Sequence, residues 1–370
     1  MGQTITLRVL AMKYWKLIGA LALALAAFAL ACDGDGGAPQ EGTPTAAPAD
    51  ATPTEATPGD VQRSPIVPPT PVVCVPVEPE PSTSTIPLAE VLPIGKIAFV
   101  SFRDEYEGRP NREIYLISAD SDGPVNLTRN SCADDEPDWS PDGSKIAWES
   151  DREGGNFQIF VMNADGSDVT QLTTDGGLAP RWSPDGKLIA YTRGGTIQVM
   201  NADGSNPEVV LGADPGAPAE ELCQSGGFPG GWSPDGSRIV YYSASASGGG
   251  GQVCTVTVDG SEVEVVVSEP GVYNVEPVWS PDGKLIAFRS IRNENHDIFV
   301  VSLEDGSERR LTEGDALDSE PDWAPDGRWI VFASNRDAIA TDIYVMRADG
   351  SDVRRLTEDP AKDSYPVWSP

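Results

Sequence analysis

Basic residues and histidine are scarce in this chain of 370 residues. It contains one histidine, His296, and 26 Lys and Arg residues against 57 Asp and Glu, so its formal net charge is −31. Proteins that bind nucleic acid draw affinity from clustered Lys and Arg side chains, so this composition argues against such a partner. Anionic lipid also repels so acidic a surface, and membrane attachment would require a covalent or hydrophobic anchor.

The same scarcity limits the possible chemistry. A Ser-His-Asp or Cys-His arrangement would depend on His296 alone, and its place in "IRNENHDIF" indicates an exposed loop just before a strand. The chain has no G-x-S-x-G elbow, its five cysteines lack zinc-site spacing, and Asp-rich turns such as "SADSDG" are too short for a calcium loop. We therefore predict no catalytic residue, no metal and no cofactor. Paired carboxylates remain open, because 57 acidic residues make chance pairs certain.

The first 31 residues contain no acidic side chain. Arg8, Lys13 and Lys16 precede an apolar run from Leu17 to Ala31, which ends at Cys32. This pattern is typical of a secretory signal, and the run is shorter than the roughly 20 residues of a membrane span. Met12 would begin an equally good signal, so the choice between Met1 and Met12 stays open.

The residues around Cys32 suggest a lipid anchor. The stretch Ala29-Leu30-Ala31-Cys32 resembles a bacterial lipobox, although Ala29 stands where that family prefers leucine. The resemblance implies that Cys32 is diacylated and becomes the mature N-terminus, with acyl chains sufficient for stable anchoring. Ordinary cleavage and a retained anchor are the alternatives.

Residues 32–94 have a different composition. Segments such as "GTPTAAPADATPTEATPGD" are rich in Pro, Thr and Ala and poor in large apolar residues. Such a chain cannot bury enough surface to offset the entropy lost on ordering, so we expect a disordered tether. A proline-rich ligand for a partner is less favoured, because Thr and Ala interrupt any regular pattern.

From Gly95 onward one pattern recurs six times. The pentapeptide "WSPDG", or "WAPDG" once, is followed by β-rich runs such as "KIAWES", "QIFVMNADG" and "VTQLT". The repeat tryptophans lie 43 to 50 residues apart, at Trp139, Trp182, Trp232, Trp279, Trp323 and Trp368. A period of this length built from strands predicts a propeller of four-stranded blades, and six repeats predict six blades. We interpret the tryptophans as structural residues packed between blades.

The two ends of the repeat region complement each other. The first repeat, from Gly95, lacks a preceding "WSPDG", and the chain stops at "PVWSP", residues 366–370. One blade built from both ends would close the ring and remove its open sheet edges. A truncated seven-bladed gene is the rival interpretation.

The repeat resembles a known family. "IAFxSxR…IYVMNADGS…RLT…PxWSPDGK" looks like the WD40-like (PD40) repeat of TolB-type β-propellers, and the resemblance covers residues 95–370. It implies an envelope protein that binds other proteins. Two departures are visible: Gly230 replaces a proline found in the other repeats, and there is no room for the N-terminal α/β domain of TolB, which puts a role in the Tol system in doubt.

Apart from Cys32, the chain has four cysteines. An exported protein with an even number of them favours disulfides. Counting strands places Cys223 and Cys254 on the same face of one blade, so this is the preferred pair, and Cys74 would then bind Cys132. Free thiols are the alternative.

One row of charged residues offers a candidate binding face. An arginine follows the second strand in five repeats, and acidic stretches such as "CADDEP" and "ALDSEP" lie beside the row. A set of structural Arg–carboxylate pairs is the preferred interpretation, and a partner-binding face at the channel mouth is the sharper one. The five residues are Arg103, Arg152, Arg193, Arg292 and Arg336.

These features favour a non-enzymatic, membrane-anchored envelope lipoprotein, periplasmic or on the cell surface. We expect it to be a monomer that presents its propeller to a protein or peptide. The alternative is a propeller for glycans or small ligands with weak hydrolase or lyase activity, and a third hypothesis is a mechanical spacer. Fold alone does not decide among them.

Overall fold

The computed structural model describes residues 95–106, 108–118, 123–152, 155–212, 223, 226–244, 250–292 and 294–370. Every regular element in these ranges is a β-strand. The predicted signal, Cys32 and the tether lie outside the described residues. Within the described ranges, no helix has the length and apolarity needed to span a membrane.

The described ranges contain 24 strands. In chain order they are β1 (Lys96–Tyr106), β2 (Arg109–Ser118), β3 (Val125–Asn126), β4 (Asp134–Trp139), β5 (Lys145–Ser150), β6 (Gln158–Asn163), β7 (Thr170–Gln171), β8 (Leu178–Trp182), β9 (Leu188–Arg193), β10 (Thr196–Asn201), β11 (Glu208–Leu211), β12 (Phe228–Trp232), β13 (Arg238–Ala244), β14 (Gly251–Thr257), β15 (Val263–Val267), β16 (Tyr273–Trp279), β17 (Leu285–Arg292), β18 (Asn295–Ser302), β19 (Glu308–Arg310), β20 (Asp318–Trp323), β21 (Trp329–Ser334), β22 (Asp342–Arg347), β23 (Arg354–Arg355) and β24 (Asp363–Trp368).

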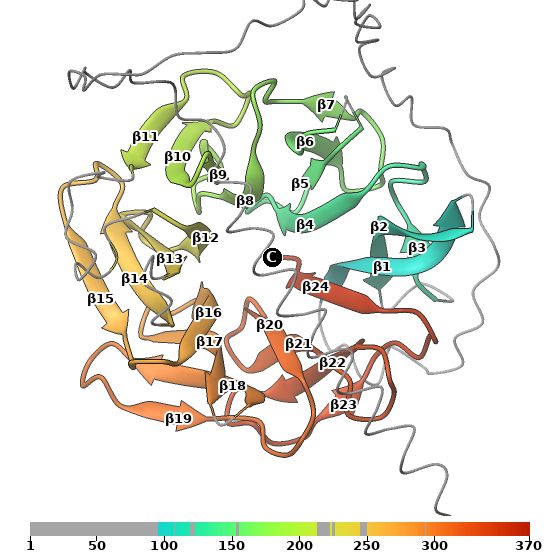
Figure 1. Cartoon of the computed structure of the whole chain (residues 1–370). Helices are drawn as coiled ribbons and strands as arrows, with labels where there is room; N and C mark the ends of the chain where they lie inside the picture. Colours follow the sequence, from blue (N-terminus) through green and yellow to red (C-terminus); the bar gives the residue numbers. More distant parts are fainter. Residues whose placement is uncertain are drawn as a thin grey trace, which may run out of the picture. The chain divides into compact units, whose positions relative to one another are not determined.

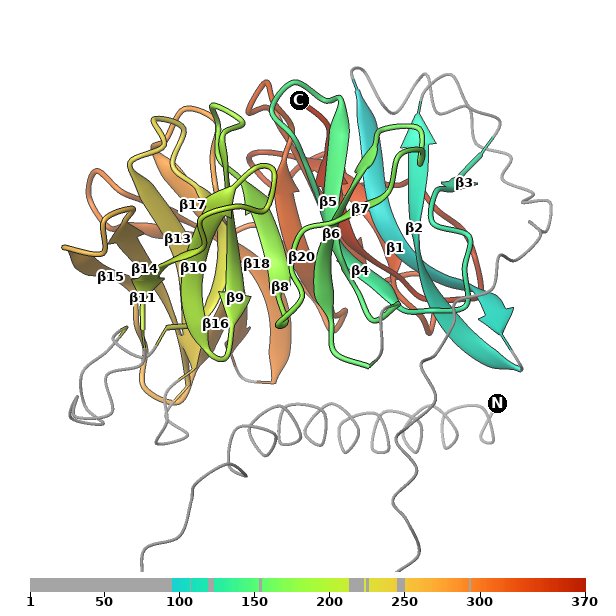
Figure 2. The same cartoon turned by 90° about the horizontal axis from the view of Figure 1, so that it is seen from above.

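The strands form antiparallel sheets arranged around a common centre (Figure 1). In each four-stranded unit, the strand that ends in the repeat tryptophan lies innermost, and the next three strands step outward, as in β4-β5-β6-β7. Viewed from above, the units stand side by side with their strands roughly parallel to the ring axis (Figure 2). The all-β propeller predicted from the repeat is therefore confirmed.

The prediction of six separate four-stranded blades needs correction. Four sheets are separate, but the other eight strands form one sheet that runs from β12 to β19. Each half of that sheet is antiparallel, and the halves meet at one parallel pair, Gly251 with Tyr273.

Glycine explains this fusion. Gly251 donates a backbone hydrogen bond to the Val272 carbonyl at 3.0 Å. A Cβ atom on the preceding Gly250, whose φ is +114°, would lie 2.2 Å from the same oxygen. Only a chain without side chains at this point can bring β14 so close to the start of β16.

The final strand lies beside the first. β24 pairs antiparallel with β1, so the sheet at this point has the order β24-β1-β2-β3. Lys96 N donates to Ser369 Oγ at 2.8 Å, and Ser369 N donates to the Lys96 carbonyl at 2.8 Å. The two ends of the repeat region thus build one unit together, as their sequences predict.

The four Trp-Ser-Pro-Asp-Gly turns are held by the same local bonds. In the turn after Trp139, Ser140 Oγ donates to Asp142 Oδ1 at 2.7 Å, and Gly143 adopts a φ of +68°. Ser144 N donates to the same carboxylate at 3.0 Å. Because glycine accepts positive φ without penalty, the Pro-Asp-Gly sequence closes the hairpin.

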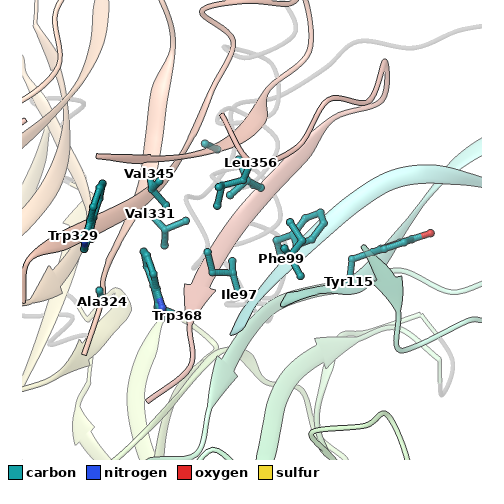
Figure 3. Packing of buried hydrophobic residues seen from close by; sticks show 12 residues of the cluster. Ile97, Phe99, Tyr115, Ala324, Trp329, Val331, Val345, Leu356 and Trp368 are labelled. Atoms are coloured by element: carbon teal, nitrogen blue, oxygen red, sulfur yellow. The ribbon is translucent and has the colours of Figure 1, made fainter. Parts of the chain in front are cut away.

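The repeat tryptophans pack between neighbouring units. Trp368 of β24 belongs to a buried cluster that joins Ile97 and Phe99 of β1 to Trp329 and Val331 of β21 (Figure 3). Trp139 likewise packs against residues of the β1 unit, and Trp182 against residues of the β5 unit. These tryptophans therefore belong to the core of the ring.

Candidate functional site at the ring centre

The six inner strands are irregular at the same place. In five of them, the residue three positions before the tryptophan has positive φ: Glu136, Ala179, Glu276, Glu320 and Tyr365, at 48° to 56°. The register shifts at each of these positions, which marks a β-bulge. Bulges redirect side chains, and positive φ is uncommon outside glycine. In β12 the sequence Pro229-Gly230-Gly231 carries the bulge, and Gly231 has a φ of +152°.

These bulged segments line a cavity at the centre of the ring. Its volume is ≈ 250 Å³, and all six inner strands contribute. Its charged lining residues are Glu136, Asp138, Arg181, Glu276, Glu320 and Asp322. Five carboxyl groups against one guanidinium make the cavity acidic.

Arg181 is the cation among these acids. Its Nη2 lies 2.9 Å from Glu136 Oε2, and its Nη1 donates to the Pro180 carbonyl at 2.8 Å. Burial opposes the charged form, but Glu136 and Asp138 outweigh it and raise the pKa of Arg181. A second pair, Arg289 with Glu276 at 2.7 Å, lies on the β16 side of the ring.

Several of the acids hold neighbouring units together. Asp138 of β4 accepts a hydrogen bond from Trp182 N at 2.6 Å, and Asp322 of β20 accepts one from Trp368 N at 2.7 Å. Glu276 of β16 accepts a hydrogen bond from Glu320 N at 2.8 Å, and Glu320 of β20 accepts one from Tyr365 N at 2.6 Å. In both cases the donor stands at the bulge of the next inner strand. We call these four bonds the inter-blade carboxylate bonds. They fix the shape of the cavity wall.

Burial shifts the protonation of these groups. Desolvation raises the pKa of Asp138 and of Glu320 to about 7, and that of Asp322 to about 6. Desolvation also raises the pKa of Glu136, while Arg181 opposes the shift. Asp138, Glu320 and Asp322 therefore titrate closer to neutral pH than exposed carboxyl groups do.

Aromatic rings complete the lining. Phe228 of β12 stacks on Tyr242 of β13, with ring centroids 5.3 Å apart and planes inclined by 17°. Tyr365 of β24 stands at the bulge next to Glu320, and burial raises the pKa of both tyrosines. Flat rings beside carboxylates can receive apolar, sugar-like or cationic groups.

The five arginines of the predicted binding face do not line this cavity in the described structure. Four donate from Nε to the serine two residues earlier, Arg336 to Ser334 at 2.9 Å for example. Three pair with a buried aspartate five residues before the repeat tryptophan: Arg103 with Asp363 at 2.9 Å, Arg152 with Asp134 at 2.7 Å, and Arg336 with Asp318 at 2.8 Å.

The other two arginines have more exposed partners. Arg193 pairs with Asp175 at 3.0 Å, and Arg292 pairs with Glu308 at 2.5 Å. The stretches "DDEP" and "DSEP", expected in loops beside the arginines, instead begin the inner strands β4 and β20. Their first aspartates serve as the buried partners, because that end of the inner strand lies beside the end of the second strand.

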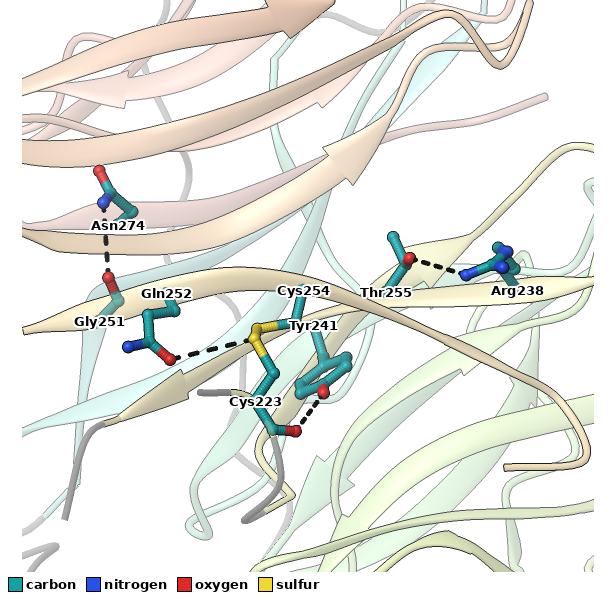
Figure 4. Close-up of a disulfide and its surroundings, with 8 residues drawn as sticks. All are labelled: Cys223, Arg238, Tyr241, Gly251, Gln252, Cys254, Thr255 and Asn274. Atoms are coloured by element: carbon teal, nitrogen blue, oxygen red, sulfur yellow. Dashed lines mark hydrogen bonds between the residues drawn. A yellow bond between two sulfur atoms is a disulfide. The ribbon is translucent and has the colours of Figure 1, made fainter. Parts of the chain in front are cut away.

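The cysteine prediction holds for the residues that the structure describes. Cys223, just before β12, forms a disulfide with Cys254 of β14, with Cα atoms 6.0 Å apart (Figure 4). Tyr241 Oη donates to the Cys223 carbonyl at 2.5 Å and is buried with the disulfide. Cys132 is buried and disulfide-bonded, whereas Cys74 lies outside the described residues, so that pairing stays a prediction.

The position of His296 differs from the one expected. His296 lies within β18, half-buried and bridged to Leu317, so its expected position in an exposed loop was wrong. No group of three His, Cys, Asp or Glu side chains in the described ranges is placed to hold a metal ion. Sequence reasoning missed the cavity acids. The recurring "EPDW" before the turn contained the signal, since it places carboxylates one and three positions before an inner-strand tryptophan.

Fold and cavity define the class: a β-propeller with an acidic central cavity, which we call the channel. The family model of the PD40 TolB beta propeller domain matches residues 95–211 and 196–370. The chain therefore belongs to the TolB-type β-propeller family.

Solved structures and curated relatives agree with this assignment. The chain resembles the crystal structure of TolB from Acinetobacter baumannii with a TM-score of 0.60 and 22% identity, covering 75% of this chain and 67% of that one. It is 27% identical over 203 residues to "Uncharacterized peptidase YuxL" of Bacillus subtilis, covering 51% of this chain and 27% of that relative. It is 33% identical over 98 residues to the Tol-Pal system protein TolB of Desulfosudis oleivorans, covering 26% of this chain and 21% of that relative. The chain thus spans only about a quarter of the length of these curated relatives.

Proposed function

We propose that this protein is a non-enzymatic envelope module whose propeller binds a protein or peptide at the mouth of the central channel. The observation that carries the proposal is that the channel carboxyl groups already have hydrogen-bond or ion-pair partners within the protein. Asp138, Asp322 and Glu320 already accept backbone N–H groups of the next unit, and Glu136 already pairs with Arg181. Carboxyl groups bonded in this way shape the cavity wall and are not free to face a substrate as a general acid and base.

The rest of the proposal concerns placement in the cell. The signal-like segment 1–31 and the lipobox-like Cys32 support export and lipid anchoring on the outer face of the cytoplasmic membrane, periplasmic or at the surface. Residues 32–94 would tether a monomeric propeller of residues 95–370. In this proposal the eight-stranded sheet counts as two blades, which gives a six-bladed ring closed by β24. Tol-Pal system proteins among the relatives are consistent with an envelope location.

The test is site-specific photocrosslinking in cells. A benzoylphenylalanine replaces Phe228, which lines the channel and is already aromatic. A second probe replaces Ile339, which is 84% exposed in the loop after Arg336 and samples the arginine row. We expect one envelope protein to be captured from position 228. Capture from 339 alone would move the site to the arginine face, and no capture from either by a folded protein would refute the binding proposal.

One observation favours a second candidate. The stacked pair Phe228 and Tyr242 beside channel carboxylates is the kind of surface that holds a sugar ring, so a glycan or small ligand with weak hydrolase or lyase chemistry is the alternative. Screening oligosaccharides by NMR line broadening on the wild type and on Tyr242→Ala tests it. Binding that is lost in the variant would support this candidate.

A further inference from the structure

The outer edges of the blades differ in length. Four units end in an outer strand of two or three residues: β3, β7, β19 and β23. Natural sheets keep exposed edges short because unpaired N–H and C=O groups invite another strand. β15, with five residues, and β11, with four, depart from this pattern.

β15 is the longest of these edges and is open. It pairs with β14 on one side and, among the described residues, with no strand on the other. It stands on the outer rim of the ring (Figure 1). Its sequence, Val-Glu-Val-Val-Val, contains no proline, Glu264 is exposed, and Val265 is 41% exposed. This composition suits continued strand pairing.

The strand beneath this edge is held rigidly. In the register of β14 and β15, Cys254 lies opposite Val265. Cys254 is fully buried and is bonded to Cys223. Because β15 is hydrogen-bonded to this disulfide-linked strand, its backbone loses little conformational entropy when a partner strand pairs with it, which lowers the cost of binding.

The charge around the edge selects the partner. Glu262 and Glu264 both reach toward Arg238, at 2.8 and 3.6 Å. One guanidinium faces two carboxylates, each side chain 69% exposed, so the edge keeps an excess negative charge. A basic strand complements that charge, and a second copy of this chain, with its net charge of −31, does not.

We propose that the outer edge of β15 is a docking site for an extended basic peptide segment of a partner protein, which adds to the sheet as a further strand. Backbone hydrogen bonds supply affinity, while Val265 and Glu264 select alternating apolar and basic side chains. This surface is separate from the channel and independent of the function proposed for it, since β15 is the outermost strand of its unit.

The first test uses a defined probe, the fluorescein-labelled peptide Gly-Lys-Val-Thr-Val-Arg-Val-Thr-Gly, with the full chain in fluorescence anisotropy. We expect saturable binding that weakens as salt rises. A peptide with Glu in place of Lys and Arg, and one with Pro at the central Val, should each bind at least tenfold more weakly. Hydrogen exchange on the complex should slow at β15 amides.

Matched variants locate the site. Val265→Lys and Glu264→Lys should each weaken binding at least tenfold. Val125→Lys should change it less than twofold, because Val125 is also 41% exposed but lies on the two-residue edge β3. Circular dichroism checks that each variant is folded. Unchanged binding in both the Val265→Lys and the Glu264→Lys variants, no binding by the wild type, or self-association through β15 in sedimentation experiments would each overturn the proposal.

Discussion

The β20–β23 unit and the β12–β15 unit stabilise the same four-stranded arrangement by different means. In the β20 unit, Arg336 pairs with buried Asp318 and stacks over Phe332 and Tyr344, with its guanidinium carbon 5.1 and 5.3 Å from the ring centroids. Asp322 of the same unit also accepts an inter-blade carboxylate bond. This unit is held by a buried polar network.

The β12 unit lacks that network. The position five residues before its tryptophan is Gly227, which has no carboxylate to offer. Instead the disulfide joins Cys223 to Cys254, and Gly230 lets the inner strand approach β16 closely. The repeat therefore sets the strand order, while the contacts that stabilise each unit differ from one unit to the next.

Gly230→Ala should be the most damaging substitution. A Cβ atom there would lie 1.7 Å from the Pro277 carbonyl oxygen, so the backbone of β16 must move. Overpacking usually costs about 1–3 kcal/mol, and because this contact is with backbone we expect a loss of about 4 kcal/mol in the free energy of unfolding. Urea unfolding followed by tryptophan fluorescence measures it.

Gly212→Ala is the control for that substitution. Its Cβ would meet nothing nearer than a Val209 methyl carbon at 3.7 Å, so we expect a change below about 0.5 kcal/mol. Equal effects of the two substitutions would show that close packing between β12 and β16 does not matter.

Arg336→Met should cost about 3 kcal/mol. The substitution keeps the apolar stem but leaves the Asp318 carboxylate buried without its cation. Chemical denaturation gives the value. In the matched variant Arg193→Met the partner, Asp175, is 70% exposed, so less than about 0.5 kcal/mol should be lost. A loss in Arg193→Met as large as in Arg336→Met would mean that burial of the aspartate is not the cause.

Removing the disulfide should cost the β12 unit about 3 kcal/mol. The link closes a chain separation of 31 residues, and loss of such a loop constraint stabilises the unfolded state. The variant Cys223→Ala/Cys254→Ala is compared with the wild type by thermal unfolding, and hydrogen exchange should quicken first in β12–β15. Uniform quickening around the whole ring would contradict the view that this unit depends on its own bond.

Much of this architecture was predictable from the sequence because it repeats. Periodic tryptophans and turn sequences give strand order, and complementary ends give the β24–β1 pairing. Cys223 and Cys254 could be paired because counting strands places both on one face of a unit. These inferences need only local rules applied many times.

The contacts that distinguish the units were not predictable in the same way. The fusion of two blades depends on Gly251 meeting Tyr273 across a loop, and no periodicity records that approach. The acids of the channel depend on bulges with positive φ at Glu136, Glu276 and Glu320, a backbone conformation that these residues rarely adopt. The arginine row was visible, but its buried partners appear only when the inner strand lies beside the second strand.

Acidification should stabilise the units that carry inter-blade carboxylate bonds. The pKa values of Asp138 and Glu320 are raised to about 7 and that of Asp322 to about 6, all above the value near 4 in an unfolded chain. The folded state therefore binds more protons, so stability from these groups is fully present below pH 4 and is lost as pH rises through 6 to 7. We expect the free energy of unfolding to increase as the pH falls from 8 to 5.

Exposed turn aspartates oppose this trend only in stronger acid. Hydrogen bonds from Ser140 and Ser144 lower the pKa of Asp142 to about 2, so its contribution is present above pH 4 and is lost as pH falls toward 2. Urea unfolding across this range should thus show a maximum near pH 4 to 5. Asp322→Asn should flatten the slope between pH 5 and pH 8, whereas Asp142→Asn should leave it unchanged. An unaltered slope in Asp322→Asn would mean that the bond from Trp368 N to Asp322 is not a source of the pH dependence. The β20 and β12 units would then differ in their contacts but not in how their stability responds to pH.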